Sequence, residues 1–170
     1  MKYWVIAVIL FVNMILQSSL LPFLEVFGIQ PDTLMVLVCC FGLLGGSYYG
    51  LFTGLAGGLL QDILYGGPIG LAALHYMLIG FLVGQLNERV YLGKLLIPIL
   101  CAFGGSIVRG MLMMAYMYFM RIEFSASVAL SLVILPEALY TALFMPLTFY
   151  LMSLLFRQRF MRKRWSFRRR

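Results

Sequence analysis

The chain has 170 residues, of which 63% are hydrophobic and only 11% are charged, and its mean hydropathy is +0.98. A soluble domain has about one-quarter charged residues and about half apolar ones, so this composition excludes a soluble enzyme or soluble binding domain for most of the chain. The net charge of +7 comes largely from the C-terminal end. The length allows one compact helical bundle in a bilayer, but not a bundle plus a separate soluble domain.

Six apolar segments are predicted to form membrane-spanning helices, because a span needs about 20 mostly apolar residues. In chain order they lie near residues 3–21, 32–45, 47–64, 69–87, 95–120 and 128–156. Prolines and glycines separate them, as in "GGS" at 45–47 and "GGP" at 66–68. The second is short, and the sixth is long enough to tilt or to extend past the membrane. We predict an all-α integral membrane protein with a six-helix domain over 1–156 and a basic tail over 157–170.

Charge predicts the orientation, because Lys and Arg are in excess on the cytoplasmic side of membrane proteins. In this topology one side of the membrane carries most of the basic residues: Lys2, Arg89, Lys94 and the tail residues Arg157, Arg159, Arg162, Lys163, Arg164, Arg168, Arg169 and Arg170. The other side carries Arg121 beside the acidic residues Glu25, Asp32 and Glu123. Both termini are therefore expected in the cytoplasm.

The tail "RFMRKRWSFRRR" mixes arginine with aromatic residues, a composition also seen in nucleic-acid-binding segments. We favour a membrane-surface role instead, in which the aromatic rings lie at the interface and the charges meet anionic lipid. Each such charge contributes on the order of 1 kcal/mol of attraction. An acidic cytoplasmic partner is the alternative, and no nucleic acid is expected.

Glycines at intervals of four residues predict close helix packing, because residues four apart share one side of a helix. They are Gly46, Gly50, Gly54 and Gly58 in the third segment, and Gly80 and Gly84 in the fourth. Small residues let helix backbones approach each other, which matters in lipid, where burying apolar surface gains little. The stripes could pack within the bundle or against a helix of another protein. The first stripe leads directly to Asp62.

Four predicted helices each carry one ionisable residue: Asp62, His75, Arg109 and Glu137. A charge at the bilayer centre costs about 2.5–3.5 kcal/mol on insertion scales, so such residues are expected to pair. At about 1.5 Å of rise per residue, Asp62 and Arg109 both lie roughly 20 Å from the cytoplasmic edge of a core about 30 Å thick. His75 and Glu137 lie about 9 Å and 14 Å from the outer edge. All four are therefore expected in the outer half of the membrane.

These depths predict an ion pair between Asp62 and Arg109, with Glu137 close enough to share the same guanidinium. Gln61 points about 100° away from Asp62 on a helix and is expected to tolerate leucine. The cluster could be a structural ion pair that fixes helix register, or a site for a ligand or partner.

Catalysis, metal binding and cofactors are not expected from these residues. An aspartyl intramembrane protease needs two membrane aspartates, and a metalloprotease needs His-Glu-x-x-His, whereas His75 is the sole histidine. Cys39, Cys40 and Cys101 lie in apolar segments without a histidine at ligand spacing, so they are interpreted as small buried side chains.

Three segments carry a resemblance to a known family: "QPDTLMVLV" (30–38), "GLFTGLAGGLLQDILYGGPIGLAALHYMLIGFLVGQL" (50–86) and "LPEALYTALFMPL" (135–147). With the basic tail, they resemble the family of the rod shape-determining protein MreD. In that family the third helix ends in Leu-x-x-Asp followed by a Pro/Leu-Gly turn, here Leu59, Asp62, Pro68 and Gly70. A Pro-Glu pair, here Pro136 and Glu137, opens the middle of the last helix. Thr141 departs from the pattern, since many members have Asn there.

The resemblance implies a non-catalytic multi-pass protein of the bacterial inner membrane that supports cell elongation and lateral peptidoglycan synthesis. It would bind the bitopic scaffold MreC and, through it, MreB, RodA and a class B penicillin-binding protein. The family fold is similar to the S components of energy-coupling-factor transporters, which leaves a vitamin-binding transporter subunit as the alternative function. Against that alternative, S components usually dock through Ala-x-x-x-Ala on the first helix, where Ala7 is the sole alanine.

Overall fold

The computed structural model describes residues 2–19, 21–25, 28–66, 68–89, 95–122 and 126–157, and these residues form a bundle of helices. The long helices are α1 (Lys2–Ser19), α2 (Thr33–Gly45), α3 (Ser47–Tyr65), α4 (Leu71–Gly84) and α5 (Leu96–Phe119). The last helix runs without a break through α6 (Ala126–Ala129), the π-helical segment η3 (Leu130–Ile134) and α7 (Leu135–Arg157). Two 3₁₀ turns, η1 (Leu21–Leu24) and η2 (Gln85–Arg89), follow α1 and α4.

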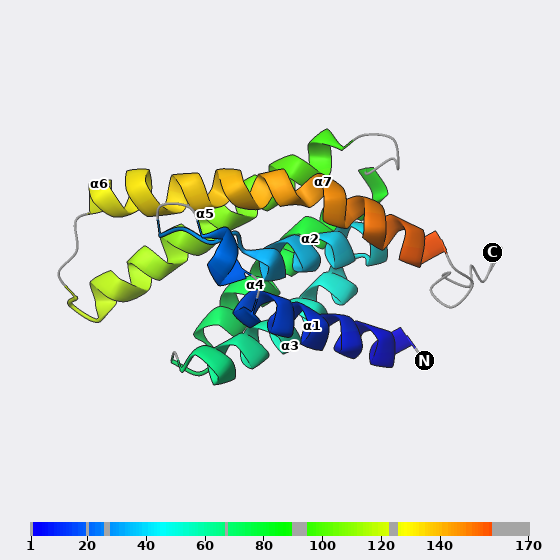
Figure 1. Ribbon diagram of the computed structural model, residues 1–170, viewed down its shortest axis with the longest axis horizontal. Coiled ribbons are helices and arrows are strands. Elements are labelled where there is room, and N and C mark those ends of the chain that lie inside the picture. The colour runs from blue at the N-terminus through cyan, green and yellow to red at the C-terminus, as the bar shows by residue number, and fades with distance from the viewer. Residues whose placement is uncertain are drawn as a thin grey trace, which may run out of the picture.

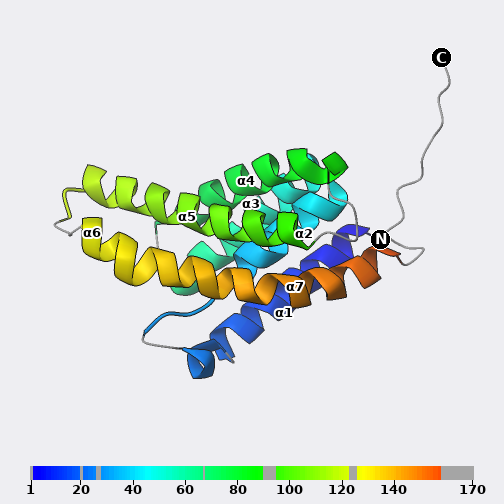
Figure 2. The ribbon, with the colours of Figure 1, turned by 90° about the horizontal axis from the view of Figure 1, so that it is seen from above.

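The prediction of an all-helical fold with six helices is confirmed over the described residues, with boundaries within about two or three residues of those predicted. The first helix begins and the last helix ends at the same end of the bundle (Figures 1 and 2). Most of the predicted basic tail, residues 158–170, lies outside the described residues, as does the connection over 90–94.

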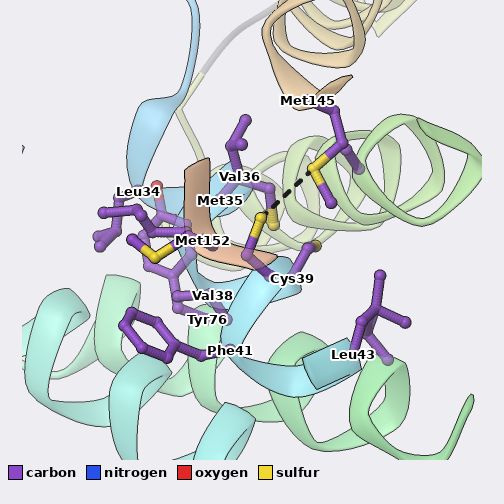
Figure 3. Close-up of a cluster of buried hydrophobic side chains, with 14 of the residues drawn as sticks. Leu34, Met35, Val36, Val38, Cys39, Phe41, Leu43, Tyr76, Met145 and Met152 are labelled. Carbon is purple, nitrogen blue, oxygen red and sulfur yellow. Dashed lines mark hydrogen bonds between the residues drawn. The ribbon is translucent and has the colours of Figure 1, made fainter. Parts of the chain in front are cut away.

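Helix α2 forms the centre of the molecule, and every residue from Leu34 to Leu43 is buried. A helix that is apolar on all sides needs neighbours on all sides, and α2 contacts α3, α4, α5 and α7. Figure 3 shows the side chains of α2 in one cluster with Tyr76 of α4 and with Met145 and Met152 of α7. With 13 residues, α2 is about 20 Å long, shorter than a bilayer core.

Helices α3 and α4 form the closest pair in the bundle, because glycine backbones meet between them. A Cβ at Gly50 would overlap the carbonyl oxygen of Gly80, and one at Gly54 would overlap the carbonyl oxygen of Tyr76. The predicted stripes therefore pack inside the bundle, with Gly58 against Ala73 and Gly84 against Ser47, the residue that opens α3.

Gly46 is an exception, and its prediction as a packing residue is wrong. A Cβ there would meet nothing within 4 Å, and the residue has a φ of +102° between α2 and α3. Glycine adopts this conformation without the steric cost that other residues would have. The spacing of four places Gly46 in the stripe only if α3 begins earlier than Ser47.

The last helix and α5 lie side by side and extend beyond the other helices at the end where they are connected (Figures 1 and 2). Among the described residues these are the 2 helices long and apolar enough to cross a membrane, over Leu96–Phe119 and Ser127–Phe156. Large apolar side chains cover the outside of the bundle, including Phe11 at 62% exposure, Leu132 at 63% and Leu143 at 72%. Apolar surface of this extent is typical of contact with lipid.

Candidate functional site

Asp62 lies near the C-terminal end of α3 and is 6% exposed. Its carboxylate accepts hydrogen bonds from three backbone N–H groups at the start of α4: Gly70 at 2.8 Å, Ala72 at 3.1 Å and Ala73 at 3.3 Å. The first N–H groups of a helix lack partners within the helix and carry a partial positive charge. Asp62 therefore closes the turn between α3 and α4 and neutralises the end of α4.

The predicted ion pair between Asp62 and Arg109 is wrong. The ion pairs of Arg109 are with Asp32, whose Oδ2 lies 3.2 Å from Nε, and with Glu137 through Nη2. Depth along a single helix does not reveal the backbone donors of the next helix. Those donors lie eight to eleven residues beyond Asp62 in the chain, so the turn brings them back onto the carboxylate.

Arg109 is the centre of a network that joins four helices. Its Nη1 donates to the hydroxyl of Tyr76 at 3.1 Å, and that hydroxyl donates to Asp32 Oδ2 at 2.7 Å. Nη2 donates to Glu137 Oε1. The guanidinium of α5 thus meets the start of α2, the middle of α4 and the first turn of α7. The predicted contact of Glu137 with this guanidinium is present.

Asp32 has a second role in this network, because it is also the N-cap of α2. Its Oδ1 accepts the backbone N–H of Met35 at 2.9 Å, and its own N–H donates to Thr141 Oγ1 at 3.0 Å. Thr141 is fully buried, so the position that departs from the family pattern still holds a polar contact. Asp32 is 4% exposed, although the predicted topology put it at the outer end of the second span, on the external side of the membrane.

A cavity of about 420 Å³ lies beside this network. All four ionisable residues of the predicted cluster line it: Asp62, His75, Arg109 and Glu137. Gln61 also lines it, although its side chain was predicted to point about 100° away from that of Asp62. The helices therefore bring the four side chains to one place, but the carboxylate that pairs with Arg109 from beneath is Asp32.

Sequence reasoning missed Asp32, Tyr76 and Thr141. One signal for Asp32 was available, since Asp followed by a long apolar run is typical of a helix N-cap. Nothing in the sequence marked Tyr76 or Thr141, because their role depends on helices that are distant in the chain.

Among the described residues, no group of three or more His, Cys, Asp or Glu side chains could hold a metal ion. Cys39 and Cys40 are buried free thiols on α2, and Cys101 is a half-buried one on α5. All three contribute to apolar packing, since Cys39 and Cys40 belong to the buried core and Cys101 packs against it.

Comparison with protein families gives one decisive match: the family model of the rod shape-determining protein MreD covers residues 1–158. The chain belongs to the MreD family. No curated protein and no solved structure matches the chain. Members of the MreD family are non-catalytic membrane proteins that act in rod shape determination.

Each of the three segments that carried the resemblance to MreD supplies a residue of the site. The Leu-x-x-Asp motif supplies Asp62, and its turn supplies Gly70, whose N–H that carboxylate binds. The Pro-Glu pair supplies Glu137, and the segment over 30–38 supplies Asp32. In this chain the MreD motifs therefore build one polar centre rather than separate features.

Proposed function

We propose that this protein is a multi-pass scaffold of the rod complex in the bacterial inner membrane, with six spans and both termini in the cytoplasm. It binds MreC and thereby supports the assembly of MreB, RodA and a class B penicillin-binding protein during lateral wall synthesis. The domain over 1–156 carries this role, and the tail over 157–170 binds anionic lipid.

Membership of the MreD family is the observation that carries the proposal. The network around Arg109 agrees with a scaffold, because its side chains bind one another and fix four helices in one arrangement. The shared end of the first and last helices agrees with termini on one side of the membrane (Figure 1). The excess of Lys and Arg near these termini supports the proposal that this side is the cytoplasm.

Labelling of single cysteines tests the orientation. Cysteines at positions 26, 67 and 124 are expected to react with a membrane-impermeant maleimide from outside the inner membrane, and one at position 92 is not. The natural Cys39, Cys40 and Cys101 would first be changed to alanine or serine. Labelling of position 92 but not of position 124 would reverse the proposed topology.

We assign the binding of the MreC membrane helix to the groove between α1 and α3. This groove has a volume of about 580 Å³, and its walls are largely apolar. Ala7 of α1 and Ala56 of α3 are among its lining residues, and small residues allow a further helix to approach closely. The glycine stripe of α3 is already occupied by α4, so it does not offer this surface.

Paired substitutions test both the function and the surface. Depletion of the protein should round rod-shaped or ovoid cells, and the wild-type gene should restore their shape. Ala56→Trp should fail to restore it and should lose co-purification of MreC. Ala115→Trp, an exposed alanine on α5, is the matched control and should behave as wild type. If Ala56→Trp retains MreC, the partner helix binds elsewhere.

The alternative function, a vitamin-binding subunit of a transporter, is favoured by one observation, the cavity beside Arg109. It predicts that depleted cells keep their shape and lose uptake of one vitamin. Rounding with normal uptake would exclude it.

A further inference from the structure

The cavity beside Arg109 has the dimensions and walls of a ligand site, which goes beyond the role of a scaffold. Its volume of about 420 Å³ falls within the range of about 300–1,000 Å³ that is usual for small-molecule pockets. Met113, Met114 and Met117 of α5 form one wall, and Val133 and Ile134 of the π-helical segment form another. Methionine side chains adapt to ligands of irregular shape, and π-helical segments often occur at functional sites.

The floor of this cavity is polar, and its side chains come from four helices. Arg109 and Glu137 keep 25% and 18% of their side-chain surface exposed, whereas the side chain of Asp32 keeps only 3%. Arg109 and Glu137 therefore line the open side of the ion-pair network, and Asp32 lies beneath them. An occupant of the cavity would meet the exposed side of that ion pair.

Glu137 is the carboxylate of the floor that is most open to a cation. Asp62 binds the three N–H groups of α4, and Asp32 caps α2 through the Met35 N–H and also binds the Tyr76 hydroxyl. Glu137 accepts from Arg109 through Oε1, and its side chain keeps 18% of its surface exposed. A carboxylate has about four lone-pair sites, so a cationic group in the cavity would meet acceptor capacity on Glu137.

Gln61 supplies an observation that is independent of the charges. Its carboxamide oxygen Oε1 is buried and accepts no hydrogen bond from any residue that the structure describes. Gln61 also lines the cavity beside Asp62. A buried acceptor of this kind needs a donor, and an ammonium group offers three.

We propose that the cavity between α3, α4, α5 and the last helix binds an amphiphile with a protonated amine head group. The ammonium lies between Glu137 and the oxygen of Gln61, and the apolar part lies along the methionines of α5. An anionic head group would be repelled by the carboxylate of Glu137 and would offer no donor to the oxygen of Gln61, and an uncharged head group would lack the attraction to Glu137. The amine belongs either to a membrane lipid or to a soluble amphiphile that enters the cavity.

Photocrosslinking of the full-length protein in phosphatidylcholine nanodiscs tests the proposal. The probe is dodecylamine with a diazirine in its chain, and the labelled peptides are identified by mass spectrometry. Labelling is expected on the segment from Met113 to Met117. Unlabelled dodecylamine should compete, and dodecanol of the same chain length should not. Equal competition by dodecanol would show that the apolar walls alone bind the chain, which would overturn the proposal.

Two variants separate the amine site from general contact with lipid. Gln61→Leu should weaken competition by dodecylamine about tenfold, the effect of losing one hydrogen bond to a charged group, while thermal unfolding stays unchanged. Val133→Phe should block labelling because it fills the cavity. Val128→Phe is the matched control, since Val128 is 51% exposed, Val133 is 50% exposed, and only Val133 lines the cavity. Equal labelling of the two valine variants would overturn the proposal.

The source of the amine is tested by the lipid of the nanodisc. Replacing phosphatidylcholine with phosphatidylethanolamine should suppress labelling if a lipid head group is the natural occupant. Undiminished labelling would assign the site to a soluble amine.

Discussion

The α3–α4 pair and the group of α2, α5 and α7 are held together by different physical means. Between α3 and α4, glycine backbones touch, and the carboxylate of Asp62 binds the N–H groups of the following helix. Between α2 and α7, large buried side chains fill the space (Figure 3). Arg109 of α5 joins two carboxylates that are far apart in the chain.

The difference follows from separation along the chain. Helices joined by a short turn can place a carboxylate directly on the free N–H groups of the next helix, so no side-chain counter-charge is needed. Helices α2, α5 and α7 are not joined to one another by short turns. The charged side chains that meet between them, Asp32, Arg109 and Glu137, therefore bind one another. One aspartate is therefore a local cap, and the other belongs to a long-range ion network.

The largest expected effect is the loss of one partner from the Arg109 network. Asp32→Ala should lower the free energy of unfolding by about 3–5 kcal/mol, because it removes one of the two carboxylates that Arg109 binds and leaves the Tyr76 hydroxyl and the Met35 N–H without their acceptor. Unfolding by dodecyl sulfate in maltoside micelles measures it. Asp32→Asn keeps an oxygen for the Met35 N–H and should fall between wild type and Asp32→Ala. If Asp32→Ala leaves the free energy of unfolding unchanged, the Arg109 network does not hold α2, α5 and α7 together.

The second effect concerns the backbone contact between α3 and α4. Gly54→Ala should lower the free energy of unfolding by about 1–3 kcal/mol, because the new methyl group overlaps the carbonyl oxygen of Tyr76. The same unfolding assay applies. The pair packs less closely than described if Gly54→Ala is as stable as wild type.

The third prediction contrasts Asp62 with Asp32 directly. Asp62→Ala should cost about 0.5–2 kcal/mol, the range for loss of a helix N-terminal cap. The double change with Arg109→Ala should be additive within about 0.5 kcal/mol, whereas Asp32→Ala and Arg109→Ala should be strongly coupled. Coupling of Asp62 to Arg109 above that of Asp32 would restore the pair predicted from the sequence.

The smallest expected effect is a gain. Gly104 lies in α5, and a Cβ there would meet nothing within 4 Å. Gly104→Ala should therefore raise the free energy of unfolding by up to about 1 kcal/mol through helix propensity alone. This change is the control for Gly54→Ala, and a loss of stability would mean that α5 needs a glycine for another reason.

The sequence by itself determined the helices, their approximate ends and the small residues that let α3 meet α4. These features depend on residues close together in the chain, since apolar runs, turn residues and a spacing of four are local patterns. The ionisable residues of the site, Asp62, His75, Arg109 and Glu137, could also be named, because charges in apolar helices stand out.

Only the tertiary structure decided which groups those residues contact. Asp62 binds backbone N–H groups that exist only once the turn after α3 is formed, and Asp32 becomes buried only when α5 and α7 cover the start of α2. Tyr76 and Thr141 join the network for the same reason. A periodic pattern gives the face and depth of a residue on its own helix, but the nearest partner is set by how helices pack around it.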